Sequence, residues 1–253
     1  MTYASVLDRI IPDGGAFRLS ELMKTMTKER PIIFSAPMVC AILEGRKTQT
    51  RRIIKPQPTH LHSFAGVSHP CKSDETKTPS CTGEIPSPYG GIGDRLWVRE
   101  MFKLWDYDIE TVCVEYAAGG EDQLFPKAEI PKEVRPHLHF RGPGGTKLER
   151  QSISMPRWAS RITLEITGIR VERLQEITER DALSEGIEER FVQVGKYSNP
   201  TPIYVAFPEK DGGLNTARAA FEMAWDRING KRASWESNPW VWVVEFKRVG
   251  QNA

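Results

Sequence analysis

The chain has 253 residues, a formal net charge of +2, and 39% hydrophobic against 27% charged residues, a composition typical of a globular protein that can bury a sizeable core. Such a small net charge excludes nucleic-acid binding through the overall field alone. No apolar run approaches the ~20 residues of a membrane-spanning helix, and residues 1–20 lack the apolar core of a signal peptide. The 4 cysteines are irregularly spaced and favour reduced thiols in a cytoplasmic protein.

The first predicted elements surround a basic segment. Residues 1–27 look like an appendage, and the strand-like run of residues 27–34 is a more natural start for a single domain over 28–253. An apolar run over residues 36–44 predicts a short helix that Gly45 ends. Directly behind it lies what we call the basic segment, Gly45-Arg46-Lys47-Thr48-Gln49-Thr50-Arg51-Arg52.

The basic segment mixes two kinds of side chain. Its cations suit the negative end of a helix, and a basic stripe is often simply a solvated face. Neither explanation accounts for the two threonine hydroxyls among the cations. Cations and hydroxyls at short range are what a polar, anionic or acyl-bearing ligand requires.

The middle of the chain reads as loops and short strands. Residues 55–92 are rich in Pro, Ser, Thr, Gly and His and predict a loop. The potential metal ligands in this segment are His60, His62, His69, Cys71 and Cys81. They lack the Cys-x2-Cys spacing of structural zinc sites, so we predict neither a metal nor a cofactor. Residues 93–100 predict a turn and a half-buried strand, and residues 111–116 a second strand.

The second half shows clearer patterns. Alternation predicts a strand over residues 162–167, and Thr178-Glu179-Arg180-Asp181 starts a short helix that runs through Ile187. Residues 191–213 read as irregular, residues 216–228 as a helix, and residues 240–249 as a buried strand. Because no regular strand–helix repeat is visible, we predict an α+β fold: a small, mainly antiparallel β-barrel with short packed helices. Insertions are expected at about 56–92, 105–155 and 188–213.

Taken together, these segments resemble the ASCH domain, a member of the PUA-like superfamily of small β-barrels. The family signature Gly-x-Lys-x-x-Glu-x-Arg matches Gly45, Lys47 and Arg52, with Thr50 in place of the glutamate. The layout is similar to prophage-encoded ASCH-like proteins that carry Arg-Pro-Ile-x-Phe-Ser, Gly-Asp-x-Leu-Trp-Val-Arg-Glu and Pro-Trp-Val-Trp. The resemblance covers about residues 30–55, 93–103 and 155–249, and it implies a PUA-like fold.

The threonine is the form seen in bacterial ASCH amidohydrolases, which remove the acetyl group from N4-acetylcytidine. Those enzymes use a Lys, a Thr three residues later and a Glu in a later helix, which correspond here to Lys47, Thr50 and Glu185. The resemblance implies Thr50 as nucleophile, Lys47 as base and Glu185 as orienting group or proton shuttle. Residues three apart on a strand face opposite sides, so Lys47 and Thr50 can cooperate only if Lys47 lies in the turn after Gly45 and the strand begins near Thr48.

The expected ligand is a nucleoside or single-stranded RNA. Beside the catalytic residues, the candidate ligand-binding residues are Gly45, Arg46, Arg51, Arg52, Trp97 and Arg99. Trp97 and Trp158 are the candidates for base stacking, whereas Trp225 and Trp242 are expected to pack in the core. Two alternatives remain open: a non-catalytic RNA- or nucleotide-binding module, and a phage-associated accessory protein with no small-molecule site.

Overall fold

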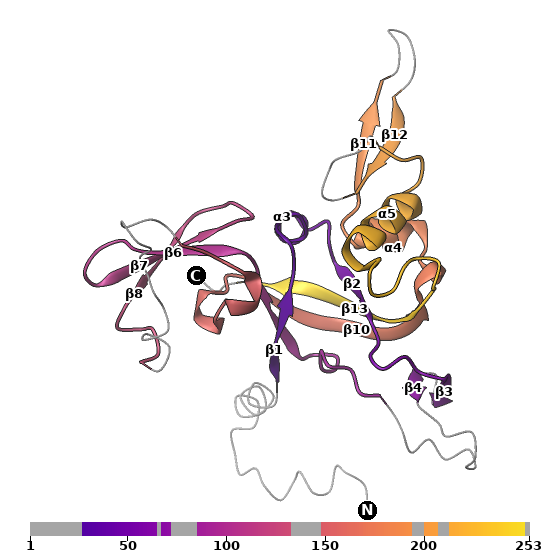
Figure 1. Ribbon diagram of the computed structural model, residues 1–253, viewed down its shortest axis with the longest axis horizontal. Coiled ribbons are helices and arrows are strands. Elements are labelled where there is room, and N and C mark those ends of the chain that lie inside the picture. The colour runs from indigo at the N-terminus through magenta and orange to yellow at the C-terminus, as the bar shows by residue number, and fades with distance from the viewer. Residues whose placement is uncertain are drawn as a thin grey trace, which may run out of the picture.

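The computed structural model describes residues 27–64, 67–71, 85–132, 148–193, 200–206 and 213–250; the predicted appendage over residues 1–27 therefore lies almost wholly outside them. The centre of the fold is a five-stranded sheet in the order β1-β5-β10-β13-β2 (Figure 1). Its strands are β1 (Glu29–Ile33), β5 (Arg95–Arg99), β10 (Thr163–Arg173), β13 (Trp240–Val249) and β2 (Gln49–Ile53). β1 and β5 run parallel, and every other neighbouring pair in this sheet runs antiparallel.

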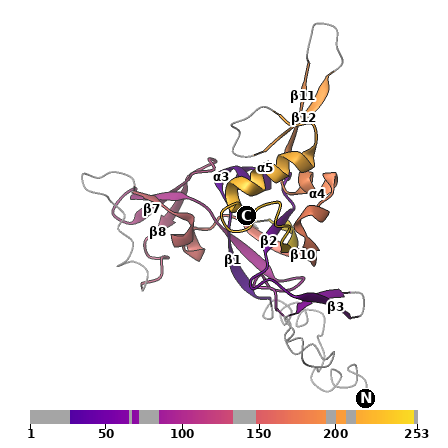
Figure 2. The same ribbon diagram turned by 45° about the vertical axis from the view of Figure 1, so that its right-hand side comes forward.

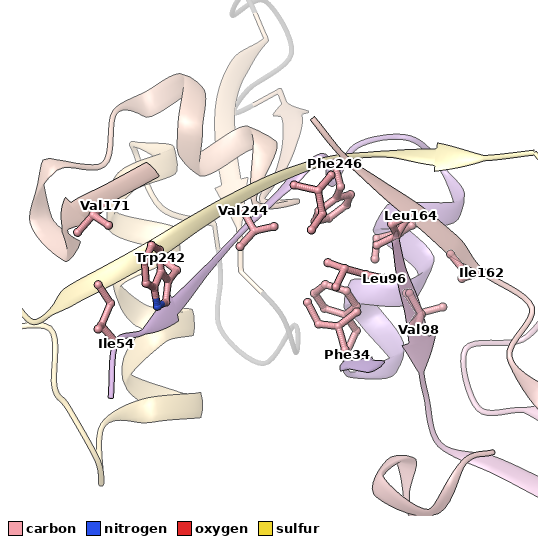
Figure 3. Packing of buried hydrophobic residues seen from close by; sticks show 14 residues of the cluster. Phe34, Ile54, Leu96, Val98, Ile162, Leu164, Val171, Trp242, Val244 and Phe246 are labelled. Atoms are coloured by element: carbon pink, nitrogen blue, oxygen red, sulfur yellow. The ribbon is translucent and has the colours of Figure 1, made fainter. Parts of the chain in front are cut away.

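The central sheet is buried on both faces. On one face Trp242 and Val244 of β13 join a core that includes Phe34 and Leu96, and Figure 3 shows these side chains gathered between the strands and a helix. The intervening residues of β13, Val241 and Val243, pack on the other face in a second core. Burial of both faces explains why β13 reads as a continuous apolar run rather than an alternating one.

Within the described ranges, three α-helices cover this sheet. Helix α3 (Ala36–Leu43) packs Val39 and Ile42 into the first core. Helices α4 (Glu179–Ser184) and α5 (Ala217–Asn229) pack on the second core. The Thr178 and Asp181 side chains form the capping box that begins α4, as predicted. Short 3-10 helices lie at η3 (Ser152–Ser154), η4 (Arg157–Ala159) and η5 (Leu174–Glu176).

Three peripheral β structures project from the centre on different sides (Figures 1 and 2). A four-stranded sheet has the order β8-β7-β6-β9 and comprises β6 (Phe102–Asp106), β7 (Thr111–Tyr116), β8 (Gln123–Pro126) and β9 (Leu148–Arg150). The other two are the antiparallel pairs β3 (His60–Phe64) with β4 (Val67–Cys71), and β11 (Glu188–Val192) with β12 (Thr201–Val205).

The paired strands correct two sequence predictions. The segment of residues 55–92 was predicted to be a loop, but β3 and β4 lie within it, and β11 and β12 occupy parts of the segment predicted to be irregular. Backbone hydrogen bonds between polar strands need no apolar pattern, which is why periodicity did not reveal them.

The architecture is α+β and dominated by antiparallel strands, as predicted. β1 and β2 form the two edges of the central sheet, and the sheet curls enough for Arg52 Nη2 of β2 to donate to the carbonyl oxygen of Ile33 in β1 at 2.6 Å. Across the described ranges, no helix is long and apolar enough to cross a membrane.

Candidate functional site

The turn after α3 places Lys47 before the strand begins. Gly45 has φ +77°, a conformation that glycine adopts without steric cost. The backbone N–H groups of Arg46 and Lys47 both donate to the carbonyl oxygen of Ala41, at 2.9 and 3.0 Å. β2 starts only at Gln49. Lys47 therefore lies in the turn, which is the arrangement that cooperation with Thr50 requires.

Backbone hydrogen bonds fix the basic segment between α4 and β13. The N–H of Thr48 donates to the carbonyl oxygen of Ser184, and its carbonyl accepts from the N–H of Phe246, both at 2.8 Å. Arg46 Nη1 donates to the carbonyl oxygen of Gly186 at 3.0 Å. These contacts bring the end of α4, and with it Glu185, against the basic segment.

Lys47 and Glu185 form a buried pair. Lys47 Nζ donates to Glu185 Oε2 at 2.8 Å and to the backbone carbonyl oxygen of Glu185 at 2.7 Å. The two residues are only 2% and 5% exposed. Removal from water lowers the pKa of Lys47 below its usual range, although the charge of Glu185 acts in the opposite direction. Burial disfavours the ammonium form, so this lysine is suited to accept a proton.

Arg51 fixes the second oxygen of the same carboxylate. Its fully buried guanidinium lies 3.4 Å from Glu185 Oε1, 2.8 Å from Glu172 Oε2 and 3.5 Å from Asp181 Oδ2. With Oε2 held by Lys47, both oxygens of Glu185 have cationic partners. Arg51, predicted to bind the ligand, thus positions Glu185 in the described structure. No local sequence pattern pointed to its partners Glu172 and Asp181.

Thr50 and Arg52 carry polar groups without partners. Thr50 is 3% exposed, and its hydroxyl makes no hydrogen bond with any residue that the structure describes. The Arg52 guanidinium lies over the Phe34 ring, 5.2 Å from its centroid, and its buried Nε–H likewise finds no acceptor within the described ranges. Buried polar groups are normally satisfied, so these two groups are available to a ligand.

A small cavity opens beside these groups. It has a volume of about 70 Å³, which is room for a few water molecules or a short acyl group but not for a whole nucleoside. Thr50, Arg51, Arg52 and Glu185 line it together with residues of α5, whereas Lys47 is not among its lining residues. The contribution of α5 was not predicted, because its apolar spacing indicates only a helix that faces a core.

The remaining predicted ligand residues lie elsewhere. Gly45 makes the turn, and Arg46 pairs with Glu44 and with the α4 end. Trp97 and Arg99 lie on β5, which β10 and β13 separate from β2. The Arg99 guanidinium covers the Trp97 ring at 4.5 Å, and Trp97 is only 8% exposed. The structure therefore does not bring these two residues to the cavity.

The other tryptophans lie in packing environments. Trp225 and Trp242 are buried in the two cores, as predicted. Trp158 packs its ring edge-on against Phe125, with centroids 5.1 Å apart. No tryptophan contributes an aromatic face to the cavity except Trp225, among the residues the structure describes.

The potential metal ligands do not assemble into a site within the described ranges. β3 and β4 pair His60 with Cys71 and His62 with His69, while Cys81 lies outside the described residues. No group of three or more His, Cys, Asp or Glu side chains in the described part of the chain could hold a metal ion.

In comparisons with known proteins, no protein-family model, no curated protein and no solved structure matches the chain.

Proposed function

We propose that the protein is an amide hydrolase that deacylates an N-acylated nucleobase such as N4-acetylcytidine, on a PUA-like scaffold of the ASCH type. The observation that carries the proposal is that Glu185, held in a buried pair with Lys47, lines the same cavity as Thr50, whose hydroxyl has no hydrogen-bond partner within the described ranges. The ASCH-like pattern of these three residues supports it, as does a sheet that curls until Arg52 contacts the opposite edge strand.

The proposed reaction begins at Thr50. Neutral Lys47 takes the hydroxyl proton while Thr50 Oγ1 attacks the carbonyl carbon of the amide. The N–H groups of Arg52 stabilise the oxyanion of the tetrahedral intermediate. The carbon–nitrogen bond then breaks, and the Lys47 ammonium returns the proton to the leaving nitrogen of the base.

Water completes the cycle. It adds to the acyl-threonine ester while Lys47 takes its proton; the ester bond then breaks to release the carboxylic acid, and Lys47 returns the proton to Thr50 Oγ1. The sum is amide plus water giving amine plus acid. Glu185, held at both oxygens, keeps the Lys47 amine oriented throughout. Thr50 and Lys47 are not hydrogen-bonded to each other in the described structure, and substrate binding must close that gap, as is common at catalytic sites.

One observation favours a non-catalytic alternative. Both hydrogen bonds of Lys47 Nζ end on Glu185, so the lysine is satisfied without a ligand and could serve only to shape a binding site. In that case the cavity would hold a nucleotide or an unpaired RNA base beside Arg52, without turnover.

The deciding experiment follows cytidine release from N4-acetylcytidine. We expect turnover by the wild type, a loss of about a thousandfold or more in Thr50→Val and Lys47→Ala, and retained activity in Thr50→Ser. Thr48→Val is the matched control, because Thr48 belongs to the same segment but is exposed. If folded wild type binds RNA but releases no cytidine, the hydrolase proposal is wrong and the non-catalytic binding module is supported.

A further inference from the structure

The cavity beside Thr50 has a buried end and an exposed mouth. The buried end combines the polar groups of Thr50 and Glu185 with an apolar wall. That wall consists of Ile187 and three residues of α5: Phe221, Ala224 and Trp225. The mouth is formed by residues that are partly or largely exposed: Met38, Arg52, Ile53, Ile228 and Asn229.

This division orients an amide substrate. The nucleoside side carries ribose hydroxyls, which would lose their hydrogen bonds against the Phe221 and Trp225 rings. At the mouth, Arg52 and Asn229 offer polar groups and solvent is close. The nucleoside therefore belongs at the mouth, and the acyl chain, which needs no hydrogen bonds beyond its carbonyl, belongs at the apolar end.

We propose that the α5 wall is an acyl pocket in which Ala224 sets the length of acyl chain that the enzyme accepts. This inference rests on the proposed hydrolase function and deepens it. The preferred substrates are short, unbranched N-acyl nucleobases, because the cavity measures only about 70 Å³.

The packing of α5 explains why Ala224 is the determinant. Ala224 and Trp225 lie three and four residues after Phe221, and Ile228 lies three residues after Trp225, so these side chains share one face of the helix. Trp225 is fixed by its Nε1 donating to the carbonyl oxygen of Ala233 at 2.9 Å, and Phe221 packs against Trp235 with centroids 6.3 Å apart. The rings cannot easily move, so the small side chain of Ala224 beside them leaves the space.

The test varies that side chain in both directions. The ratio of kcat/KM for N4-butyrylcytidine to kcat/KM for N4-acetylcytidine is measured in the wild type, Ala224→Val and Ala224→Gly. We expect the ratio to fall about tenfold or more in Ala224→Val and to rise in Ala224→Gly, since one methylene is worth about 10- to 200-fold in discrimination. Ala219→Val and Ala219→Gly are matched controls on the same helix, because Ala219 lies outside the cavity.

The outcomes separate the two proposals. Turnover with a ratio that neither Ala224 variant changes, or that the Ala219 variants change equally, overturns the acyl pocket and leaves the hydrolase in place. Absence of turnover on both substrates overturns the hydrolase and the pocket with it. If Ala224→Val does not fold, a rise of the ratio in Ala224→Gly supports the pocket and an unchanged ratio overturns it.

Discussion

Replacing Glu185 by alanine should destabilise the protein in a way that depends on pH. Glu185 lies 2.8 Å from Lys47 Nζ and 3.4 Å from Arg51 Nη1, and all three residues are buried. Arg51 keeps Glu172 and Asp181 as partners in the variant. The charge left without a partner is therefore that of Lys47, and its protonation decides the cost.

The magnitude follows from the pKa of that lysine. Breaking a buried pair by removing one partner costs about 3–5 kcal/mol. The part of this cost that comes from the unpaired Lys47 charge has a ceiling, because Lys47 can instead lose its proton. Deprotonation costs about 1.36 kcal/mol for each pH unit below an unfolded-state pKa of about 10.4. That ceiling is about 4.6 kcal/mol at pH 7 and about 1.2 kcal/mol at pH 9.5.

The sign is set by the direction of the shift. Burial already lowers the pKa of Lys47 in the folded protein, and Glu185 is the largest influence that raises it. Without Glu185 the folded pKa falls further, so unfolding takes up a proton over a wider range below pH 10. The stability of Glu185→Ala therefore rises with pH across that range, and its deficit relative to the wild type shrinks.

Urea denaturation at pH 7 and pH 9.5 measures this deficit. We expect a loss of about 3–5 kcal/mol at pH 7 that falls by about 2–3 kcal/mol at pH 9.5. The control is the double variant Lys47→Met/Glu185→Ala, which has no lysine to titrate and should lose this pH dependence. Equal deficits at both pH values, or the same pH dependence in the double variant, would refute the charge pairing.

Two further predictions concern charges away from the cavity. Asp94 accepts hydrogen bonds from the backbone N–H groups of Gly91 and Lys28, and these bonds lower its pKa. Asp94→Asn should therefore destabilise the protein at pH 6, and this loss should disappear as the pH falls through the folded pKa of Asp94. Identical losses at pH 6 and pH 2.5 in denaturant titrations would contradict this prediction. Arg161 donates to both oxygens of buried Glu100 at 2.9 Å, and burial raises the pKa of Glu100. Arg161→Met should therefore lower the free energy of unfolding by about 3–5 kcal/mol at pH 7 and by less at pH 4.5, where Glu100 can protonate. An equal loss at both pH values in denaturant titrations would contradict the pairing.

The strands of the central sheet were predictable because their environment imposes a pattern. In β10, Leu164 and Ile166 are buried while Thr163 and Glu165 are partly exposed, so the sequence alternates as the strand does. β3 and β4 could not be found in this way: Leu61 packs against the first core and Cys71 is buried, but the sequence of this part of the chain shows no apolar alternation. Their backbone pairing leaves no trace in side-chain periodicity.

The candidate site likewise combines features that local sequence predicts with features that depend on long-range contacts. The position of Lys47 followed from the glycine that ends α3, which is local information. The Glu172 and Asp181 carboxylates that hold Arg51 are separated from it by more than 100 residues of sequence, and the α5 wall of the cavity is further still. Only the fold brings these groups together, so the sequence could suggest candidate catalytic residues but not what surrounds them.

In the proposed hydrolase, Thr50 acts as the nucleophile and the Lys47–Glu185 pair serves as its base. The rate of cytidine release from N4-acetylcytidine, measured side by side on folded wild type and Thr50→Val, tests this role. We expect turnover by the wild type and a loss of about a thousandfold or more in the variant. Equal rates in the two proteins, or no release by either, would contradict it.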